Sequence, residues 1–150
     1  MEQLVDIRTI PGSRHNPQFG SDALAGSLRA AHIGYIHMEA LGGLRRARRD
    51  SQNAGWRNKS FRGYADYMQT AEFTHALEAL IRMGRQERTA IMCAEAVPWR
   101  CHRSLVADAL NVHGVPVIEI LSETSYRSHK LTPFAQIHGT SIVYPPEQPN

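Results

Sequence analysis

Hydrophobic positions along the chain fall into short apolar runs separated by longer stretches with helical periodicity. Runs rich in β-branched residues are typical of strands, and four of them cover residues 3–10, 35–38, 89–93 and 115–121. The third run is apolar throughout, as expected for a strand that is covered on both faces. The pattern also predicts a final strand at residues 141–144.

The intervening stretches place apolar residues three and four positions apart, which indicates helices over residues 21–32, 70–84 and 101–113. Strands that alternate with helices predict βαβ units. The expected fold class is therefore α/β: one domain over residues 1–150, with a mostly parallel sheet and helices on both faces. Ligands bind such sheets outside the carboxyl ends of the strands, which points to the residues after Ile10 and Cys93.

The composition is that of an ordinary globular protein, with 42% hydrophobic and 21% charged residues among 150. Two cysteines are few for a secreted scaffold, and the first residues lack the features of a signal peptide, so we expect a cytoplasmic protein. No apolar stretch is long enough to span a bilayer, and no membrane partner is expected. A net charge of +3 is compatible with an anionic partner but does not require one.

Asp6, Arg8 and Arg14 form the first group of candidate binding residues. Asp6 and Arg8 are two positions apart in a strand, so they share one face of an otherwise apolar run. One interpretation is a structural ion pair, because a buried charge is costly unless it is paired. The other is that Asp6 orients Arg8 as an anion ligand, since a guanidinium binds phosphate or carboxylate at two points.

The most informative segment begins where the third strand ends, at Cys93. Glu95 lies in the loop that follows, and the next helix begins with Cys101, His102, Arg103 and Ser104. A helix N-terminus attracts anions and lowers the pKa of a thiol, so Cys101 is a candidate thiolate. We predict catalytic roles for Cys93, Glu95, Cys101 and His102, and substrate binding by Asp6, Arg8, Arg14, Arg103 and Ser104.

Several known site types fit this segment less well. A tyrosine-phosphatase loop has a similar architecture, but the count of residues between Cys93 and Arg100 is wrong for it. A structural zinc site needs four ligands, and a zinc deaminase needs a Pro-Cys-x-x-Cys motif that does not follow His37, so no metal site is predicted. A disulfide between Cys93 and Cys101 is sterically conceivable, although a cytoplasmic setting argues against a structural one. Cys93 as a buried small hydrophobe also stays open.

A basic loop forms a third, weaker candidate, for contact with nucleic acid: Arg45, Arg46, Arg48, Arg49 and Trp56. Arginines neutralise phosphates, and aromatic rings stack on bases. The alternative is a solvated loop whose aromatic residues dock it onto the core.

The motifs of the chain resemble those of the domain-of-unknown-function family 488 (DUF488). They are Val5-Asp6-Ile7-Arg8 with Pro11, Ser13-Arg14 and Asn16-Pro17-Gln18-Phe19, then Leu41-Gly42-Gly43, Phe61-Arg62-Gly63-Tyr64-Ala65, Cys93-Ala94-Glu95 with Cys101-His102-Arg103-Ser104, and Leu131-Thr132-Pro133-Phe134. The resemblance covers nearly the whole chain and implies a shared pocket but no established reaction. Members usually begin with a further strand and helix, so it also implies that this chain lacks an N-terminal βα unit. Some members are loosely labelled as DNA-repair proteins.

The leading functional hypothesis is an enzyme with an anion-binding pocket that acts on a phosphorylated or nucleic-acid-related substrate. Arg8, Arg14 and Arg103 would hold the anion, and Glu95 or His102 would transfer protons. One alternative is a non-catalytic nucleic-acid-binding module that uses the basic loop. The other is a metal or redox protein built on both cysteines and His102. The sequence indicates neither a cofactor nor an oligomeric state.

Overall fold

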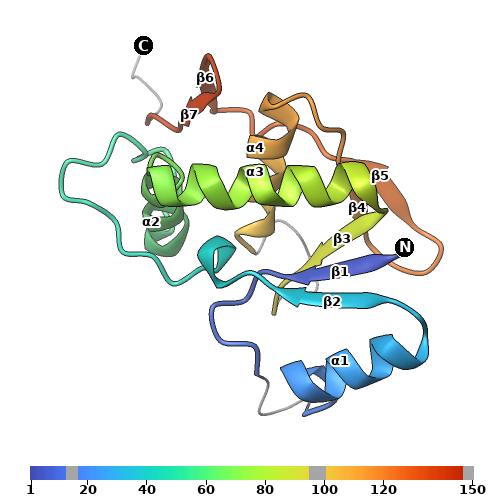
Figure 1. The fold of residues 1–150 in the computed structure, drawn as a ribbon. Coiled ribbons are helices and arrows are strands. Elements are labelled where there is room, and N and C mark those ends of the chain that lie inside the picture. Colours follow the sequence, from blue (N-terminus) through green and yellow to red (C-terminus); the bar gives the residue numbers. More distant parts are fainter. Residues whose placement is uncertain (13–16, 95–100, 147–150) are drawn as a thin grey trace.

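The computed structural model describes residues 1–12, 17–94 and 101–146, and a small parallel sheet lies at its centre (Figure 1). Three strands form this sheet in the order β2-β1-β3: β1 (Gln3–Asp6), β2 (Gly34–His37) and β3 (Thr89–Met92). Val5 aligns with Ile36 on one side and with Ile91 on the other. The carboxyl ends of the three strands therefore meet at one edge of the sheet.

Helices connect and flank the strands. They are α1 (Ser21–Ala30), α2 (Lys59–Tyr67), α3 (Ala71–Gln86) and α4 (Arg103–Val112), with short 3-10 turns η1 (Pro17–Phe19) and η2 (Glu39–Leu41). Side-chain caps start two of them, because Asn58 accepts hydrogen bonds from the first turn of α2, and Thr70 accepts one from the first turn of α3. The helices predicted at 21–32, 70–84 and 101–113 are thus present with slightly different ends.

The hydrophobic core lies between the sheet and helices α2, α3 and α4. Val5, Ile7, Leu105 and Val106 are fully buried there. In Figure 1, α3 lies on one side of the sheet and α1 on the other. These two helices differ in burial, because α3 contributes Phe73 and other residues to the core, whereas α1 contains no buried residue.

The C-terminal part corrects the expected sheet. The strand predicted at 115–121 does not extend the parallel sheet, since β4 (Ile118–Ile120) pairs antiparallel with β5 (Tyr126–Ser128). A second antiparallel pair joins β6 (Gln136–His138) to β7 (Ser141–Val143). The molecule is therefore a mixed α/β structure with a three-stranded parallel sheet and two small antiparallel ones, rather than one mostly parallel sheet covered by helices on both faces.

The long segment between η2 and α2 is fixed to the core by polar side chains. Asp66, a buried residue of α2, accepts hydrogen bonds from the Arg48 amide, the Ser51 hydroxyl and the Asn53 side chain. Asn53 is itself fully buried and accepts a hydrogen bond from the amide of Tyr144. These contacts hold the segment in place without regular secondary structure.

Candidate functional site

Cys93 and Cys101 are joined by a disulfide bond beside the carboxyl end of β3. Cys93 follows β3 directly, and Cys101 lies two residues before α4, so the bond connects a strand end to a helix start. Their Cα atoms are 7.2 Å apart, and both side chains are buried. The pairing that the sequence left open is present, and in this state neither sulfur is a thiolate.

The sulfur of Cys101 contacts the beginning of α4. The backbone N–H of Arg103 donates to Cys101 Sγ at 3.4 Å, and His102 Nδ1 lies 3.6 Å from the same sulfur. An N–H donor and a helix N-terminus both stabilise negative charge on sulfur, and an imidazole beside the sulfur does so once it is protonated. The surroundings of Cys101 therefore suit a thiolate once the disulfide is reduced.

His102 is held in one tautomer by the backbone. Its Nε2 lies 2.9 Å from the carbonyl oxygen of Ile7, which can only accept a hydrogen bond, so Nε2 carries the hydrogen. Nδ1 of the neutral ring is then unprotonated and is the atom that faces Cys101. The ring also packs against Tyr64, with centroids 4.8 Å apart. This arrangement leaves Nδ1 able to accept a proton from the thiol of Cys101.

The electrostatic surroundings keep His102 neutral. Burial lowers the pKa of its imidazole, and the carbonyl groups of Ile7 and Leu41 offset this effect only in part. The guanidinium groups of Arg103 and Arg45 lower the pKa further. A pKa below the ordinary value of 6.5 favours the neutral base near pH 7.

Asp6 and Arg8 form a buried ion pair at the end of β1. Arg8 Nη2 donates to Asp6 Oδ2 at 2.6 Å, and Arg8 Nε contacts both carboxylate oxygens at 2.9 and 3.1 Å. The hydroxyl of Tyr35 donates to the same carboxylate at 2.6 Å. The structural interpretation of this pair therefore has direct geometric support, and an anion-binding role for Arg8 stays a prediction.

Ionisation of this group follows from its contacts. Burial alone would raise the pKa of Asp6, but hydrogen bonds from Arg8 and Tyr35 outweigh burial and hold that pKa below its ordinary value. Burial and the neighbouring carboxylate raise the pKa of Tyr35 to about 12. Asp6 is therefore charged and Tyr35 is a hydrogen-bond donor at neutral pH.

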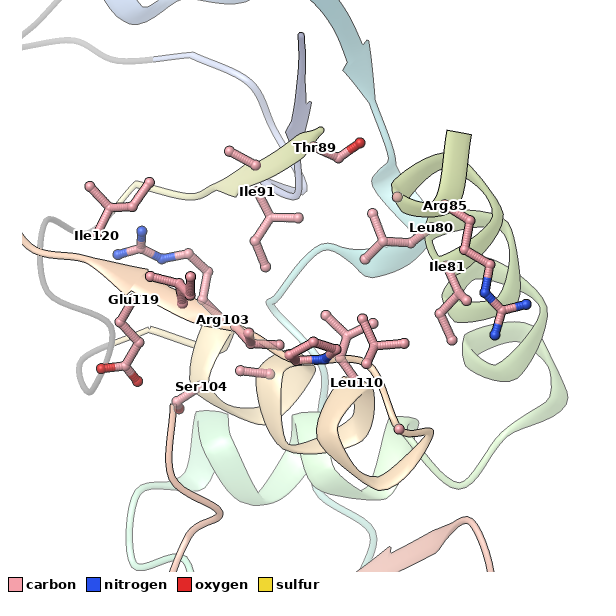
Figure 2. A pocket seen from close by; sticks show the side chains of 18 residues that line it. Leu80, Ile81, Arg85, Thr89, Ile91, Arg103, Ser104, Leu110, Glu119 and Ile120 are labelled. Carbon is pink, nitrogen blue, oxygen red and sulfur yellow. The ribbon is translucent and has the colours of Figure 1, made fainter. Parts of the chain in front are cut away.

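Of the remaining residues predicted for this site, two line a groove beside it and two lie outside the described ranges. Arg103 and Ser104 line a groove between β3 and β4, where Figure 2 shows Arg103 beside Ile120. Arg14 and Glu95 belong to residues 13–16 and 95–100, which lie outside the described part of the chain. The structure thus brings Cys93, Cys101 and His102 together and connects them to β1 through the Ile7 carbonyl.

Side-chain contacts, both within the basic loop and to the rest of the molecule, hold several of its residues in place. The guanidinium of Arg45 lies 3.7 Å from the ring centre of Tyr67, and Arg48 pairs with Asp50 at 3.1 Å. Arg46, Arg48 and Arg49 are exposed. The ring of Trp56 packs against Phe61, Phe134 and Tyr144. These contacts support the docking interpretation for Trp56, and contact of the loop with nucleic acid stays a prediction.

Sequence reasoning missed the contribution of β2. Tyr35 donates a hydrogen bond to Asp6, and His37 has its Nε2 2.6 Å from the carbonyl oxygen of Arg8. Polar residues two positions apart occur at the end of β1, with Asp6 and then Arg8 just beyond it, and on β2, with Tyr35 and His37. Adjacent parallel strands with this pattern place the polar side chains on a shared face, and this signal could have found them.

Two kinds of feature do not occur within residues 1–12, 17–94 and 101–146. In these ranges no group of three or more His, Cys, Asp or Glu side chains could hold a metal ion. None of the helices found there is long and apolar enough to cross a membrane.

Comparison with known proteins adds a family. No curated protein and no solved structure matches the chain. The model of the family described as "Domain of unknown function DUF488" matches residues 1–110. This match spans more than half of the chain, from β1 to most of α4, and includes both cysteines and His102. The chain therefore belongs to the DUF488 family.

Proposed function

We propose that this protein is a thiol-dependent enzyme that exchanges electrons between the Cys93–Cys101 pair and a disulfide in its substrate. The observation that carries the proposal is the set of groups on the sulfur of Cys101. This sulfur is bonded to Cys93, accepts the Arg103 N–H and faces the unprotonated nitrogen of His102. A buried structural disulfide has no need of an adjacent base.

The reaction begins from the reduced pair. His102 Nδ1 accepts the thiol proton of Cys101, and the thiolate attacks one sulfur of the substrate disulfide. A mixed disulfide forms, and the other half of the substrate leaves as a thiolate that takes up a proton. Cys93 then loses its proton and attacks Cys101 Sγ, which releases the second half as a thiol. The substrate is reduced by two electrons, and the Cys93–Cys101 disulfide is the oxidised product.

In this proposal, the anion expected from the sequence is a charged group of the substrate. Two cationic side chains, Arg45 and Arg103, act electrostatically on His102. Positive charge that acts on His102 favours a substrate with a negatively charged group close to its disulfide or thiol. A phosphorylated or nucleic-acid-related molecule is one class of substrate with this charge.

Reaction of the reduced protein with small disulfides tests the proposal. The protein is reduced, freed of reductant and mixed with anionic glutathione disulfide or with cationic cystamine, and the products are identified by mass spectrometry. We expect one Cys93–Cys101 disulfide for each substrate disulfide reduced, with faster reaction for the anionic compound. Cys93→Ser should accumulate a mixed disulfide at Cys101, and Cys101→Ser should accumulate none.

The matched variants separate this mechanism from its alternatives. A mixed disulfide in Cys101→Ser but not in Cys93→Ser would contradict the assignment of the attacking sulfur. The proposal would be rejected if both thiols stayed unmodified, or if they reacted no faster than a thiol in unfolded protein. Equal rates with both disulfides would contradict the preference for an anionic substrate but would not contradict the thiol chemistry.

A further inference from the structure

A groove separates the parallel sheet from the β4–β5 hairpin. It has a volume of about 650 Å³, and its walls come from β3, α3, α4 and the segment that leads into β4. Figure 2 shows Ile91 on β3, Leu80 on α3 and Leu110 on α4 directed toward the same space. The groove is therefore an apolar trough with a strand on each side.

One side of the groove is a strand edge with open hydrogen-bonding positions. The carbonyl groups of Arg88 and Met92 accept hydrogen bonds from Gln3 and Ile7, so these peptide groups face β1. Alternation along a strand turns the peptide groups of Thr89 and Ile91 the other way, toward the groove. Among the described strands β3 pairs only with β1, and no backbone hydrogen bond of the described residues reaches those positions from β4.

The opposite side of the groove is formed by β4, which is also a strand with an unpaired edge among the described residues. β4 pairs only with β5 among the described strands. Its Ile118 and Ile120 are 60% and 63% exposed, which is unusual for β-branched residues of a strand that borders a core. A single strand placed between β3 and β4 would cover these side chains and join the two sheets.

Backbone chemistry limits what can fill this space. A small apolar molecule would cover Ile91 and Ile118 but would leave the peptide groups of Thr89 and Ile91 without partners. An extended peptide supplies both the hydrogen bonds and the apolar side chains.

We propose that the groove binds an extended segment of another polypeptide, which pairs with β3 and inserts apolar side chains at alternate positions. Arg85 is exposed on the rim, where it favours an acidic residue at one end of the segment. Such strand addition gains affinity from main-chain hydrogen bonds and specificity from alternate side chains.

A designed peptide tests this inference. The probe is an eight-residue peptide that alternates valine with threonine and has a glutamate at each end, and binding is measured by calorimetry. The matched control has the same side chains but methylated amides at alternate positions along one edge. We expect binding of the unmodified peptide and at least about tenfold weaker binding of the methylated one, because several backbone hydrogen bonds are lost.

A protein variant tests the same edge from the other side. Thr89→Pro removes an N–H that faces the groove, at the first position of an edge strand, where proline is tolerated. Thr89→Val keeps the N–H and the β-branched shape and is the matched control. We expect about fivefold weaker peptide binding for Thr89→Pro and unchanged binding for Thr89→Val, with both variants folded by circular dichroism.

Three outcomes would overturn the inference. Equal affinity for both peptides would show that the groove takes apolar side chains without strand pairing. No binding of the unmodified peptide by a monomeric protein would reject a strand site. Self-association at the concentration used, detected by sedimentation and blocked by Ile118→Lys, would assign the groove to a second copy of the chain instead.

Discussion

Polar groups have hydrogen-bond partners of different origin in the C-terminal half of the molecule and along the β3 edge of its sheet. Around α4, the fully buried Asp108 accepts hydrogen bonds from Tyr144, Thr132 and His129, so a carboxylate joins α4 to the segment 129–132 and to Tyr144. Along the outer edge of β3, no other strand of the described residues lies beside the peptide groups of Thr89 and Ile91. One region satisfies its buried polar atoms internally, and the other leaves backbone groups available.

The burial of side chains also differs between the two sides of the sheet. Leu105 on α4 is fully buried, whereas α1 on the other side of the sheet has no buried residue. Parallel sheets normally have both faces and most edges covered. The contrast indicates that α2, α3, α4 and the C-terminal strands contribute more to stability through buried side chains than α1 does.

The largest expected effect comes from removing the central carboxylate. Asp108→Ala leaves the Tyr144 hydroxyl, the Thr132 amide and hydroxyl, and His129 without their shared acceptor. We expect the free energy of unfolding to fall by about 4 kcal/mol, measured by urea denaturation. Asp50→Ala is the control, because its exposed pair with Arg48 contributes about 0.5 kcal/mol or less. Similar losses for both variants would contradict the role of Asp108.

The same truncation at two leucines compares the regions directly. Leu105→Ala empties a fully buried position in α4, so we expect a loss of about 3 kcal/mol. Leu28→Ala removes a half-buried side chain of α1, and we expect a loss of about 1 kcal/mol or less. Chemical denaturation of both variants gives the difference. Equal losses would mean that α1 is part of the stabilising core.

The parts of the fold that sequence could predict are those with local signals. Periodicity and caps located the segments of α1, α3 and α4, and apolar runs located the strands of the parallel sheet. The run at 115–121 is apolar enough for a fourth parallel strand, but its partner is fixed by the chain that follows it. Residues 126–128 are polar and exposed, so no pattern predicts that they pair with β4.

The candidate site was predictable to a similar extent. Cys93, Cys101 and His102 were named because they lie at a strand end and a helix start, and the structure brings them together. The tautomer of His102 could not be predicted, because it depends on the carbonyl of Ile7, ninety-five residues away. Long-range backbone contacts of this kind carry no signature in the local sequence.

The smallest expected effects concern two histidines that respond to pH in opposite directions. Burial lowers the pKa of His129, but the hydrogen bonds that its ring donates to Asp108 and Glu119 outweigh burial and raise the pKa above 6.5. Its contribution to stability is therefore complete below pH 6.5 and is lost as the pH rises through the folded value. His102 has a lowered pKa, so its neutral form stabilises the fold above pH 6.5 and that contribution is lost as the pH falls.

Denaturation of single variants between pH 5 and 9 separates the two contributions. The stability difference between wild type and His129→Gln should be largest at the acidic end and shrink above pH 6.5. The difference for His102→Gln should grow as the pH rises toward 6.5 and stay constant above it, so each variant is the control for the other. NMR titration of the two imidazole rings gives the pKa values independently. Parallel trends in both variants would contradict the opposite pKa shifts that the contacts of His129 and His102 predict. Opposite trends would show that a fixed carboxylate network holds His129 charged, while His102 stays neutral beside the cysteines.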